Sequence, residues 1–322
     1  MIKKFKLLII TPIMHIEGIH EKLTKHFEIT YQENISENKL IKVINKFDAI
    51  FTNPNQSKIY LGKKIIDKAK NLKVITTAST GTNHIDINYL KYKKIKLISL
   101  TKEINLIKKI TSTAELSLTL TLMAIRNVIE SNINQNKGIW KYTPFIGNEF
   151  SSLNILVIGY GRLGKIYYSL CKSLGFNIYV FDPYIKIKKN IKIIKNLFLD
   201  LKKFNIISFH IHASETNKNF VNKKFLSKLK TNCILVNTSR GDIVNELELI
   251  KFLKKNKSAK YYTDVLSNEH LGPKKNLVHK FSKKTNQIFI TSHIGGMTIQ
   301  GQHKAFNHSA KLLIEHFKKI NY

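Results

Sequence analysis

The chain has 322 residues, enough for two domains of ordinary size, and 43% of them are hydrophobic, as in soluble globular proteins. It contains no apolar run of the ~20 uncharged residues that a membrane-spanning helix needs, and its two cysteines form no C-x-x-C motif. These features exclude an integral membrane protein and a disulfide-rich secreted domain, and they predict a cytoplasmic protein that does not bind membranes.

The formal net charge of +33 leaves two interpretations open. A strongly basic chain can bind nucleic acid or an anionic membrane surface. The charge can also result from drift in the amino-acid composition. Lysine, isoleucine and asparagine are abundant in every segment, which favours this interpretation. The lysines are scattered and not gathered into one block, so we favour drift and expect no specific nucleic-acid partner.

Short apolar runs alternate with lysine-rich helical stretches through the first hundred residues. Strands are predicted at 6–11, 27–32, 48–53, 72–79 and 95–101, and helices at 19–27, 37–47, 62–71 and 87–94. This alternation predicts a parallel sheet covered by helices on both faces. Residues 111–131 follow as one long helix that is apolar almost all round, and we expect it to be buried between domains or subunits.

A second alternation begins at residue 153. Strands are predicted at 153–159, 177–182, 204–211, 233–239, 260–266 and 287–293, and helices at 162–175, 222–230, 245–256 and 299–320. The fold class is therefore α/β in both halves, with a doubly wound parallel sheet in the second.

The segment "VIGYGRLG" at 157–164 carries the pattern G-x-G-x-x-G. It follows an apolar strand, opens a helix and is followed by an acidic residue, Asp182, at the end of the next strand. This context indicates a dinucleotide-binding turn and not incidental glycines. Gly159 makes the tight turn, Gly161 lets the backbone approach the pyrophosphate, and Gly164 lets helix and strand pack closely. Asp182 would accept bonds from the ribose hydroxyls and repel a 2′-phosphate, which predicts NAD and not NADP.

Polar residues follow three later strands, at the edge where an α/β sheet places its site. They are Thr238, Ser239 and Arg240 after the first of these strands, Asp264 and Glu269 after the second, and His293, Gly295 and Gly296 after the third. An arginine can hold a carboxylate through two parallel bonds, and a histidine can exchange a proton with a hydroxyl group. A glutamate bonded to the other imidazole nitrogen would fix the tautomer of the histidine. With a dinucleotide carrying the hydride, this set predicts interconversion of a 2-hydroxy acid and a 2-oxo acid.

Arg240 is unusual in its own sequence. Only three of the 54 basic residues are arginines, at positions 126, 162 and 240. A lysine would supply the same charge, but it would not supply a planar fork of donors. Arg240 is therefore predicted to anchor the substrate carboxylate. Taken singly, each of these residues also has a structural interpretation: a surface ion pair for the arginine, a loop acid for Glu269 and a structural histidine for His293.

The order and spacing of these motifs resemble the D-isomer-specific 2-hydroxyacid dehydrogenase family, which includes the D-3-phosphoglycerate dehydrogenases. The motifs that carry the resemblance are "ASTGTNHIDI" at 78–87, "TSTAEL" at 111–116, "VIGYGRLG" at 157–164, "FDPY" at 181–184, "VNTSRGDIVNE" at 236–246, "DVLSNE" at 264–269 and "TSHIGG" at 291–296. The resemblance implies a Rossmann-type NAD domain, residues 105–300, inserted into a smaller flavodoxin-like substrate domain, residues 1–104 and 301–322. It also implies a homodimer formed through the NAD domain.

The resemblance implies roles for individual residues. Arg240, Glu269 and His293 match the catalytic residues. The substrate-binding residues would be Thr80, Gly81, Arg240 and His293, and the cofactor-binding residues would be Thr80, Gly159, Gly161, Arg162, Leu163, Gly164, Asp182, Thr238, Ser239, Asp264, Gly295 and Gly296. No metal is expected.

Two features leave the specific function open. Thr52 and Asn53 stand where phosphoglycerate dehydrogenases tend to carry an arginine–serine pair for the substrate phosphate. This departure leaves the identity of the 2-hydroxy acid undecided, whereas Glu269 argues against formate. The family also includes transcriptional corepressors of the same fold, so an NAD(H)-sensing binding protein is the alternative to an enzyme.

Overall fold

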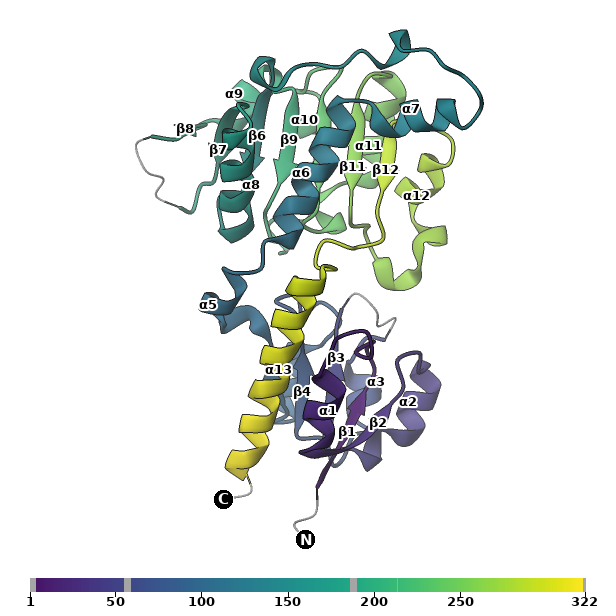
Figure 1. Ribbon diagram of the computed structural model, residues 1–322, viewed down its shortest axis with the longest axis vertical. Coiled ribbons are helices and arrows are strands. Elements are labelled where there is room, and N and C mark those ends of the chain that lie inside the picture. Colours follow the sequence, from purple (N-terminus) through teal and green to yellow (C-terminus); the bar gives the residue numbers. More distant parts are fainter. Residues whose placement is uncertain (1–3, 55–58, 186–189, 213, 321–322) are drawn as a thin grey trace. The chain divides into compact units, whose positions relative to one another are not determined.

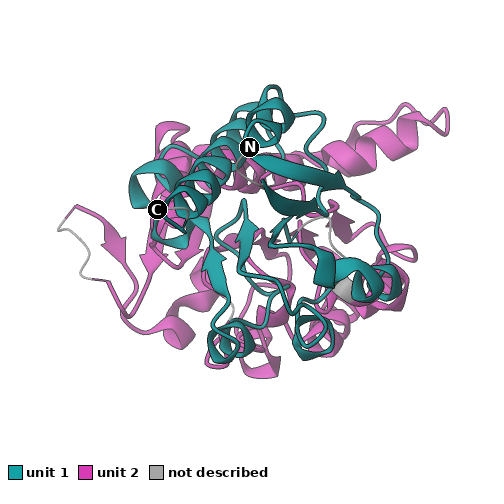
Figure 2. Ribbon diagram, turned by 90° about the horizontal axis from the view of Figure 1, so that it is seen from below, with its two compact units in different colours: residues 1–110, 297–322 teal, residues 111–296 magenta. Residues whose placement is uncertain are grey.

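The computed structural model describes residues 4–54, 59–185, 190–212 and 214–320. The chain forms two compact units, Met1–Ile110 with Met297–Tyr322, and Thr111–Gly296 (Figure 2). The second unit is thus inserted into the first. The division expected from the sequence, 1–104 with 301–322 around 105–300, has the same order and places its boundaries a few residues away.

Unit 1, the discontinuous unit, contains a five-stranded sheet in the order β2-β1-β3-β4-β5, with every pair parallel. Its strands are β1 Phe5–Ile9, β2 Phe27–Tyr31, β3 Ala49–Thr52, β4 Val74–Thr77 and β5 Lys96–Ile98. Its helices are α1 Ile19–Thr24, α2 Glu37–Val43, α3 Lys63–Ile66, α4 Ile87–Tyr92, α5 Ile104–Ile107 and α13 Ile299–Ile320 (Figure 1). One core cluster packs the sheet against α1 and α13, and another packs it against α2, α3 and α4.

Unit 2 contains a seven-stranded sheet in the order β12-β11-β10-β9-β6-β7-β8, again with every pair parallel. Its strands are β6 Asn154–Ile158, β7 Asn177–Phe181, β8 Lys192–Ile193, β9 Ile206–Phe209, β10 Ile234–Asn237, β11 Lys260–Thr263 and β12 Ile288–Ile290. Its helices are α6 Ser112–Ile125, α7 Val128–Gln135, α8 Arg162–Ser173, α9 Leu197–Asp200, α10 Lys223–Leu226, α11 Glu246–Lys255 and α12 Leu277–Ser282.

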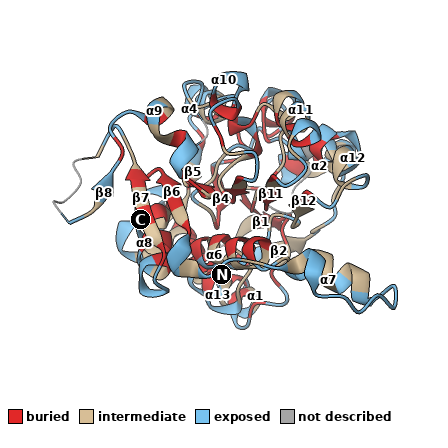
Figure 3. Ribbon diagram, turned by 90° about the horizontal axis from the view of Figure 1, so that it is seen from above, coloured by how far each residue is buried: buried red, intermediate tan, exposed pale blue. Residues whose placement is uncertain are grey.

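Helices cover both faces of the unit 2 sheet. One core cluster includes residues of α6 and α8, and another includes residues of α9, α10, α11 and α12. The central strands are buried on both faces, which explains why they are almost continuously apolar and do not alternate (Figure 3). The predicted α/β fold class with a doubly wound parallel sheet is confirmed.

The prediction of a single helix over 111–131 was wrong. Asn127 has a left-handed backbone, with φ of 52°, and it separates α6 from α7. Helix α6 packs within unit 2 against α8 and strands β10 and β11, so its apolar character is accounted for by the core of this unit. The start of α7 is anchored by Lys260 of β11, whose Nζ donates to Ala124 O at 3.2 Å, to Asn127 Oδ1 at 2.7 Å and to Glu130 Oε1 at 2.5 Å.

Several buried polar groups gather toward the carboxyl edge of the unit 1 sheet. His84, in the loop after β4, is 7% exposed, and neither ring nitrogen has a hydrogen-bond partner among the described residues. The hydroxyls of Thr11, Thr52 and Thr77 are also buried there without such a partner. Burial lowers the pKa of His84 to about 4, because the charged imidazolium would lose its hydration.

The segment that follows α7 departs from the usual burial of apolar side chains. Trp140 is 89% exposed, Tyr142 is 82% exposed and Ile146 is 74% exposed.

Both cysteines are buried and form no disulfide, and burial raises the pKa of each thiol to about 12. Within the described ranges, no helix is both long and apolar enough to cross a membrane.

Candidate functional site

The glycine-rich turn lies between β6 and α8 of unit 2. Gly159 has φ of 92°, and a Cβ there would lie 2.6 Å from His210 O. A Cβ on Gly164 would lie 2.0 Å from Gly159 O, so the helix can approach the strand only with glycine at this position. Gly161 is the N-cap of α8, and the space around its Cβ position is open. The turn therefore presents backbone N–H groups at a helix N-terminus, which suits a pyrophosphate.

Asp182, which is predicted to bind the ribose of the cofactor, directly follows β7 and lies beside this turn. Asp182 Oδ2 accepts from the backbone N–H of Tyr160 at 2.7 Å, and Oδ1 accepts from that of Tyr184 at 2.9 Å. Because each carboxylate oxygen can accept more than one bond, these contacts orient the group and leave acceptor capacity for ribose hydroxyls. Arg162 and Leu163 begin α8, and burial lowers the pKa of Arg162.

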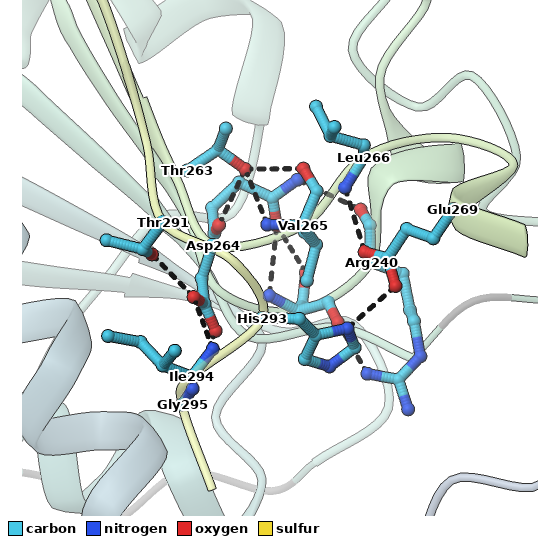
Figure 4. A network of polar contacts seen from close by, with 12 residues as sticks. Arg240, Thr263, Asp264, Val265, Leu266, Glu269, Thr291, His293, Ile294 and Gly295 are labelled. Atoms are coloured by element: carbon cyan, nitrogen blue, oxygen red, sulfur yellow. Dashed lines mark hydrogen bonds and ion pairs between the residues drawn. The ribbon is translucent and has the colours of Figure 1, made fainter. Parts of the chain in front are cut away.

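His293 and Glu269 form the central contact of the site (Figure 4). His293 Nδ1 lies 2.7 Å from Glu269 Oε2, and Glu269 Oε1 accepts from the backbone N–H of Leu266 at 2.9 Å. Burial acts to raise the pKa of Glu269, but the bond and charge of His293, the Leu266 N–H and the Arg240 charge outweigh it, so the pKa is lowered. Glu269 is therefore an anion that fixes the histidine ring. With Nδ1 engaged, proton exchange with a substrate falls to Nε2.

Arg240 follows β10 and lies close to this pair (Figure 4). Its Nη1 donates to Ser239 O at 2.6 Å, which holds the guanidinium near its own backbone. Burial lowers the pKa of Arg240, and the charges of Glu269 and Asp242 oppose this shift. The structure thus brings the three predicted catalytic residues together at the ends of neighbouring parallel strands of one sheet.

Asp264 was predicted to contact the cofactor, and the structure gives its carboxylate several partners inside the protein. It is 1% exposed; Oδ1 accepts from Thr291 Oγ1 at 2.5 Å and from the Ile294 N–H at 2.8 Å, and Oδ2 accepts from the Gly295 N–H at 2.7 Å. Burial raises the pKa of Asp264 even though these bonds favour its anion. Its contact with a cofactor stays a prediction.

The other predicted cofactor contacts of unit 2 lie in the loops that follow β10 and β12. Thr238 is buried, and its hydroxyl lies 2.5 Å from that of Ser117 on α6. Ser239 donates through both N–H and Oγ to Asn237 Oδ1, at 3.0 and 2.8 Å. A Cβ on Gly295 would meet Asp264 Oδ2 at 3.0 Å, whereas Gly296 is open.

Thr80 and Gly81 belong to unit 1, in the loop after β4. Thr80 is exposed, and its carbonyl accepts from Thr101 Oγ1 at 3.1 Å. The Gly81 N–H donates to Ser79 Oγ at 2.8 Å. Their proposed contacts with substrate and cofactor stay predictions.

Sequence reasoning missed the contribution of α6 to the site. Ser117 reaches Thr238, and Thr113 Oγ1 donates to Gly295 O at 3.1 Å. The signal was available, because Thr113, Ser117 and Thr121 recur every four residues and so share one face of α6. Within the described ranges, no group of three or more His, Cys, Asp or Glu side chains is arranged to hold a metal ion.

The chain is similar to several proteins of known family or structure. Residues 118–295, all in unit 2, match the family described as "D-isomer specific 2-hydroxyacid dehydrogenase, NAD binding domain". The chain is 29% identical over 300 residues to D-3-phosphoglycerate dehydrogenase of Archaeoglobus fulgidus, a match that covers 92% of this chain and 54% of that protein. The chain thus spans about half the length of this relative.

Other relatives differ in length and in name. Hydroxypyruvate reductase of Thermotoga maritima is 25% identical over 284 residues, which cover 87% of this chain and 88% of that protein. Among solved structures, D-lactate dehydrogenase from Aquifex aeolicus, complexed with NAD and lactic acid, superimposes with a TM-score of 0.81 at 21% identity, covering 98% of this chain and 96% of the other. This last likeness shows a shared fold.

Proposed function

Since the chain belongs to the D-isomer specific 2-hydroxyacid dehydrogenase family and has its NAD-binding domain, we propose that it is an NAD-dependent oxidoreductase that interconverts a D-2-hydroxy acid and its 2-oxo acid. The observation that carries this proposal is the 2.7 Å contact between His293 and Glu269, with Arg240 beside it. All three residues share unit 2 with the dinucleotide-binding turn.

Each side chain has a separate task in reduction of a 2-oxo acid. Bound NAD supplies the chemistry of hydride transfer. Arg240 holds the substrate carboxylate through its fork of donors, and this fixes the carbonyl that is to be reduced. His293 gives the proton from Nε2 to the carbonyl oxygen, and the Glu269 carboxylate holds the imidazole ring in place through Nδ1. In the oxidative direction, neutral His293 takes the same proton from the hydroxyl group.

The substrate side chain is the finer question. Thr52 ends β3 and Asn53 follows it; both are buried, and neither carries a charge that would pair with a phosphate. Residues 55–58 lie outside the described residues, so the segment "AIFTNPNQSK" is only partly described. The relatives act on phosphorylated and unphosphorylated acids by name, which makes both classes the first to test.

The decisive experiment is oxidation of NADH by the purified protein with a panel of hydroxypyruvate, 3-phosphohydroxypyruvate, pyruvate and 2-oxoglutarate. We expect turnover with at least one acid, and loss of that turnover in His293→Gln with NADH binding retained. Tight NADH binding without turnover of any 2-oxo acid in the panel would instead favour the NAD(H)-sensing alternative. Binding of random duplex DNA with a steep salt dependence would point to the nucleic-acid interpretation of the charge.

We also propose a homodimer. The support is the exposed apolar segment after α7, since contiguous exposed apolar side chains commonly mark protein interfaces. Light scattering should give twice the chain mass of 37.2 kDa. Trp140→Ser should shift the population toward monomer, whereas Tyr92→Ser, at a tyrosine of unit 1 that is 76% exposed, should not. A wild-type monomer at all concentrations would contradict the proposal.

A further inference from the structure

His293 has a backbone conformation that its residue type does not favour. Its φ is 55°, in the left-handed region, and it is one of five described non-glycine residues with positive φ. Such a conformation is uncommon for residues other than glycine and persists only where the surrounding structure imposes it. The next question is therefore which groups hold the turn that follows His293.

The amide side of this turn is held by Asp264. Its carboxylate accepts the consecutive backbone N–H groups of Ile294 and Gly295, at 2.8 and 2.7 Å, and the hydroxyl of Thr291, at 2.5 Å (Figure 4). These partners flank His293 on both sides in the chain. A buried carboxylate with three donors thus fixes Thr291, two positions before the histidine, and the two residues that directly follow it.

The carbonyl side is held from a different element. Thr113 Oγ1, in the first turn of α6, donates to Gly295 O at 3.1 Å. The fit is close, because a Cβ on Gly295 would lie 3.0 Å from Asp264 Oδ2 and 3.2 Å from Thr113 Cγ2. Gly295 is therefore gripped through its N–H by Asp264 and through its C=O by Thr113.

The position of this contact in unit 2 gives it a second role. Unit 2 begins at Thr111 and ends at Gly296. The bond from Thr113 to Gly295 thus joins the points where the chain enters and leaves this unit, although they are 182 residues apart in sequence. It adds to the ties that this turn has to unit 2 through the preceding strand and through Asp264.

We propose that Thr113 is a positioning residue for His293, acting with Asp264 to keep the turn in the conformation that points the imidazole at Glu269. This inference rests on the proposed function only for its kinetic consequence. Loss of the Thr113 hydroxyl loosens Gly295, allows His293 to leave the left-handed conformation and reduces the fraction of molecules in which the His293–Glu269 contact is formed.

The matched variants are Thr113→Ser, which keeps the hydroxyl, and Thr113→Ala, which differs from it only by that group. Thr119→Ser and Thr119→Ala form the control pair on the exposed face of the same helix, where the hydroxyl bonds to Glu115 O within α6. The control pair corrects for the different helix propensities of alanine and serine.

Two measurements are made on all four variants. In the protein without added cofactor, amide hydrogen exchange is followed at Ile294 and Gly295. In the reaction, kcat and the KM for NADH are measured with the best 2-oxo acid. We expect Thr113→Ala to speed exchange at both amides and to lower kcat by about fivefold relative to Thr113→Ser, the factor that matches a hydrogen bond of ~1 kcal/mol. Because Gly295 is itself a predicted cofactor contact, the KM for NADH separates two roles: a rise in this KM with kcat unchanged would assign Thr113 to cofactor binding and overturn the positioning of His293.

The outcomes separate this inference from the proposed function. Exchange rates and kcat values that differ by less than twofold between Thr113→Ser and Thr113→Ala overturn the positioning role. Equal changes in the Thr119 pair also overturn it, since they would reflect helix stability alone. If no 2-oxo acid is reduced by the wild-type protein, the proposed function fails, while hydrogen exchange still decides whether Thr113 holds the turn.

Discussion

The buried histidine of unit 1 predicts a specific loss of stability in mild acid. In the unfolded chain, His84 takes up a proton near its ordinary pKa of 6.5, whereas in the folded protein burial lowers the pKa to about 4. Above pH 6.5 the side chain is neutral in both states. As the pH falls below 6.5, the unfolded chain binds a proton that the folded chain does not, so the free energy of unfolding decreases.

The magnitude follows from the gap between the two pKa values. At ~1.4 kcal/mol for each pKa unit, a gap from 6.5 to about 4 corresponds to about 3 kcal/mol in full, of which about 2 kcal/mol is lost by pH 5. The side chain is 7% exposed, so solvent does little to screen this effect. A loss of this size is a substantial fraction of the free energy of unfolding of a typical domain, which is about 5–15 kcal/mol.

The perturbation is His84→Leu, which removes the titrating group and two buried polar atoms that lack partners among the described residues. Urea unfolding followed by circular dichroism is measured at intervals from pH 8 to pH 5 for wild type and variant. The variant should lose about 2 kcal/mol less than wild type over this range, and other titrating groups cancel in the difference. A difference that stays constant within ~0.5 kcal/mol would refute the assignment of a buried neutral histidine.

Three further predictions concern the site of unit 2. Arg240→Lys keeps the charge but loses the planar fork, so kcat/KM should fall on the order of 100-fold; a variant within threefold of wild type would rule out carboxylate anchoring. Asp182→Ala should raise the ratio of NADPH to NADH efficiency, because the carboxylate beside the turn no longer repels a 2′-phosphate; an unchanged ratio would remove Asp182 from the ribose. Glu269→Gln keeps a side chain that can bond to His293 but removes its charge, so reductive kcat/KM should fall by about tenfold, as for the loss of a charge-assisted hydrogen bond; a variant within about twofold of wild type would show that the charge of Glu269 does not contribute to the reaction.

Strands and helices with a clear hydrophobic period were predicted from the sequence, and short or interrupted elements were not. The apolar strand before Gly159 and the 22-residue helix α13 were predicted because both have clear periodicity and clear ends. Short helices were predicted poorly because they make little more than one turn: α9 and α12 were missed, and α3 and α10 were predicted at more than twice their length. The break between α6 and α7 was missed because it occurs at an asparagine in left-handed conformation, without glycine or proline to mark it.

In the site, too, features set by the local sequence were predicted and features set by tertiary contacts were not. Arg240, Glu269 and His293 were predicted as a set because parallel strands bring their carboxyl ends to one edge. The left-handed backbone of His293 was not predicted, since that region is uncommon for a histidine and its cause is a carboxylate 29 positions earlier and a threonine hydroxyl near the start of α6. Such contacts depend on the packed tertiary structure and leave no periodic trace in the sequence.

The anchoring of α7 by Lys260 shows that the basic residues of this chain differ in how freely they can be exchanged. An ammonium group has three N–H bonds in a tetrahedral arrangement, and Lys260 directs its Nζ at a carbonyl, an amide oxygen and a carboxylate. A flat guanidinium could not reach these three acceptors from one atom. Lys260 is therefore a position where the geometry requires lysine, whereas the task proposed for Arg240 requires the planar fork of arginine in a chain whose other basic residues are almost all lysine.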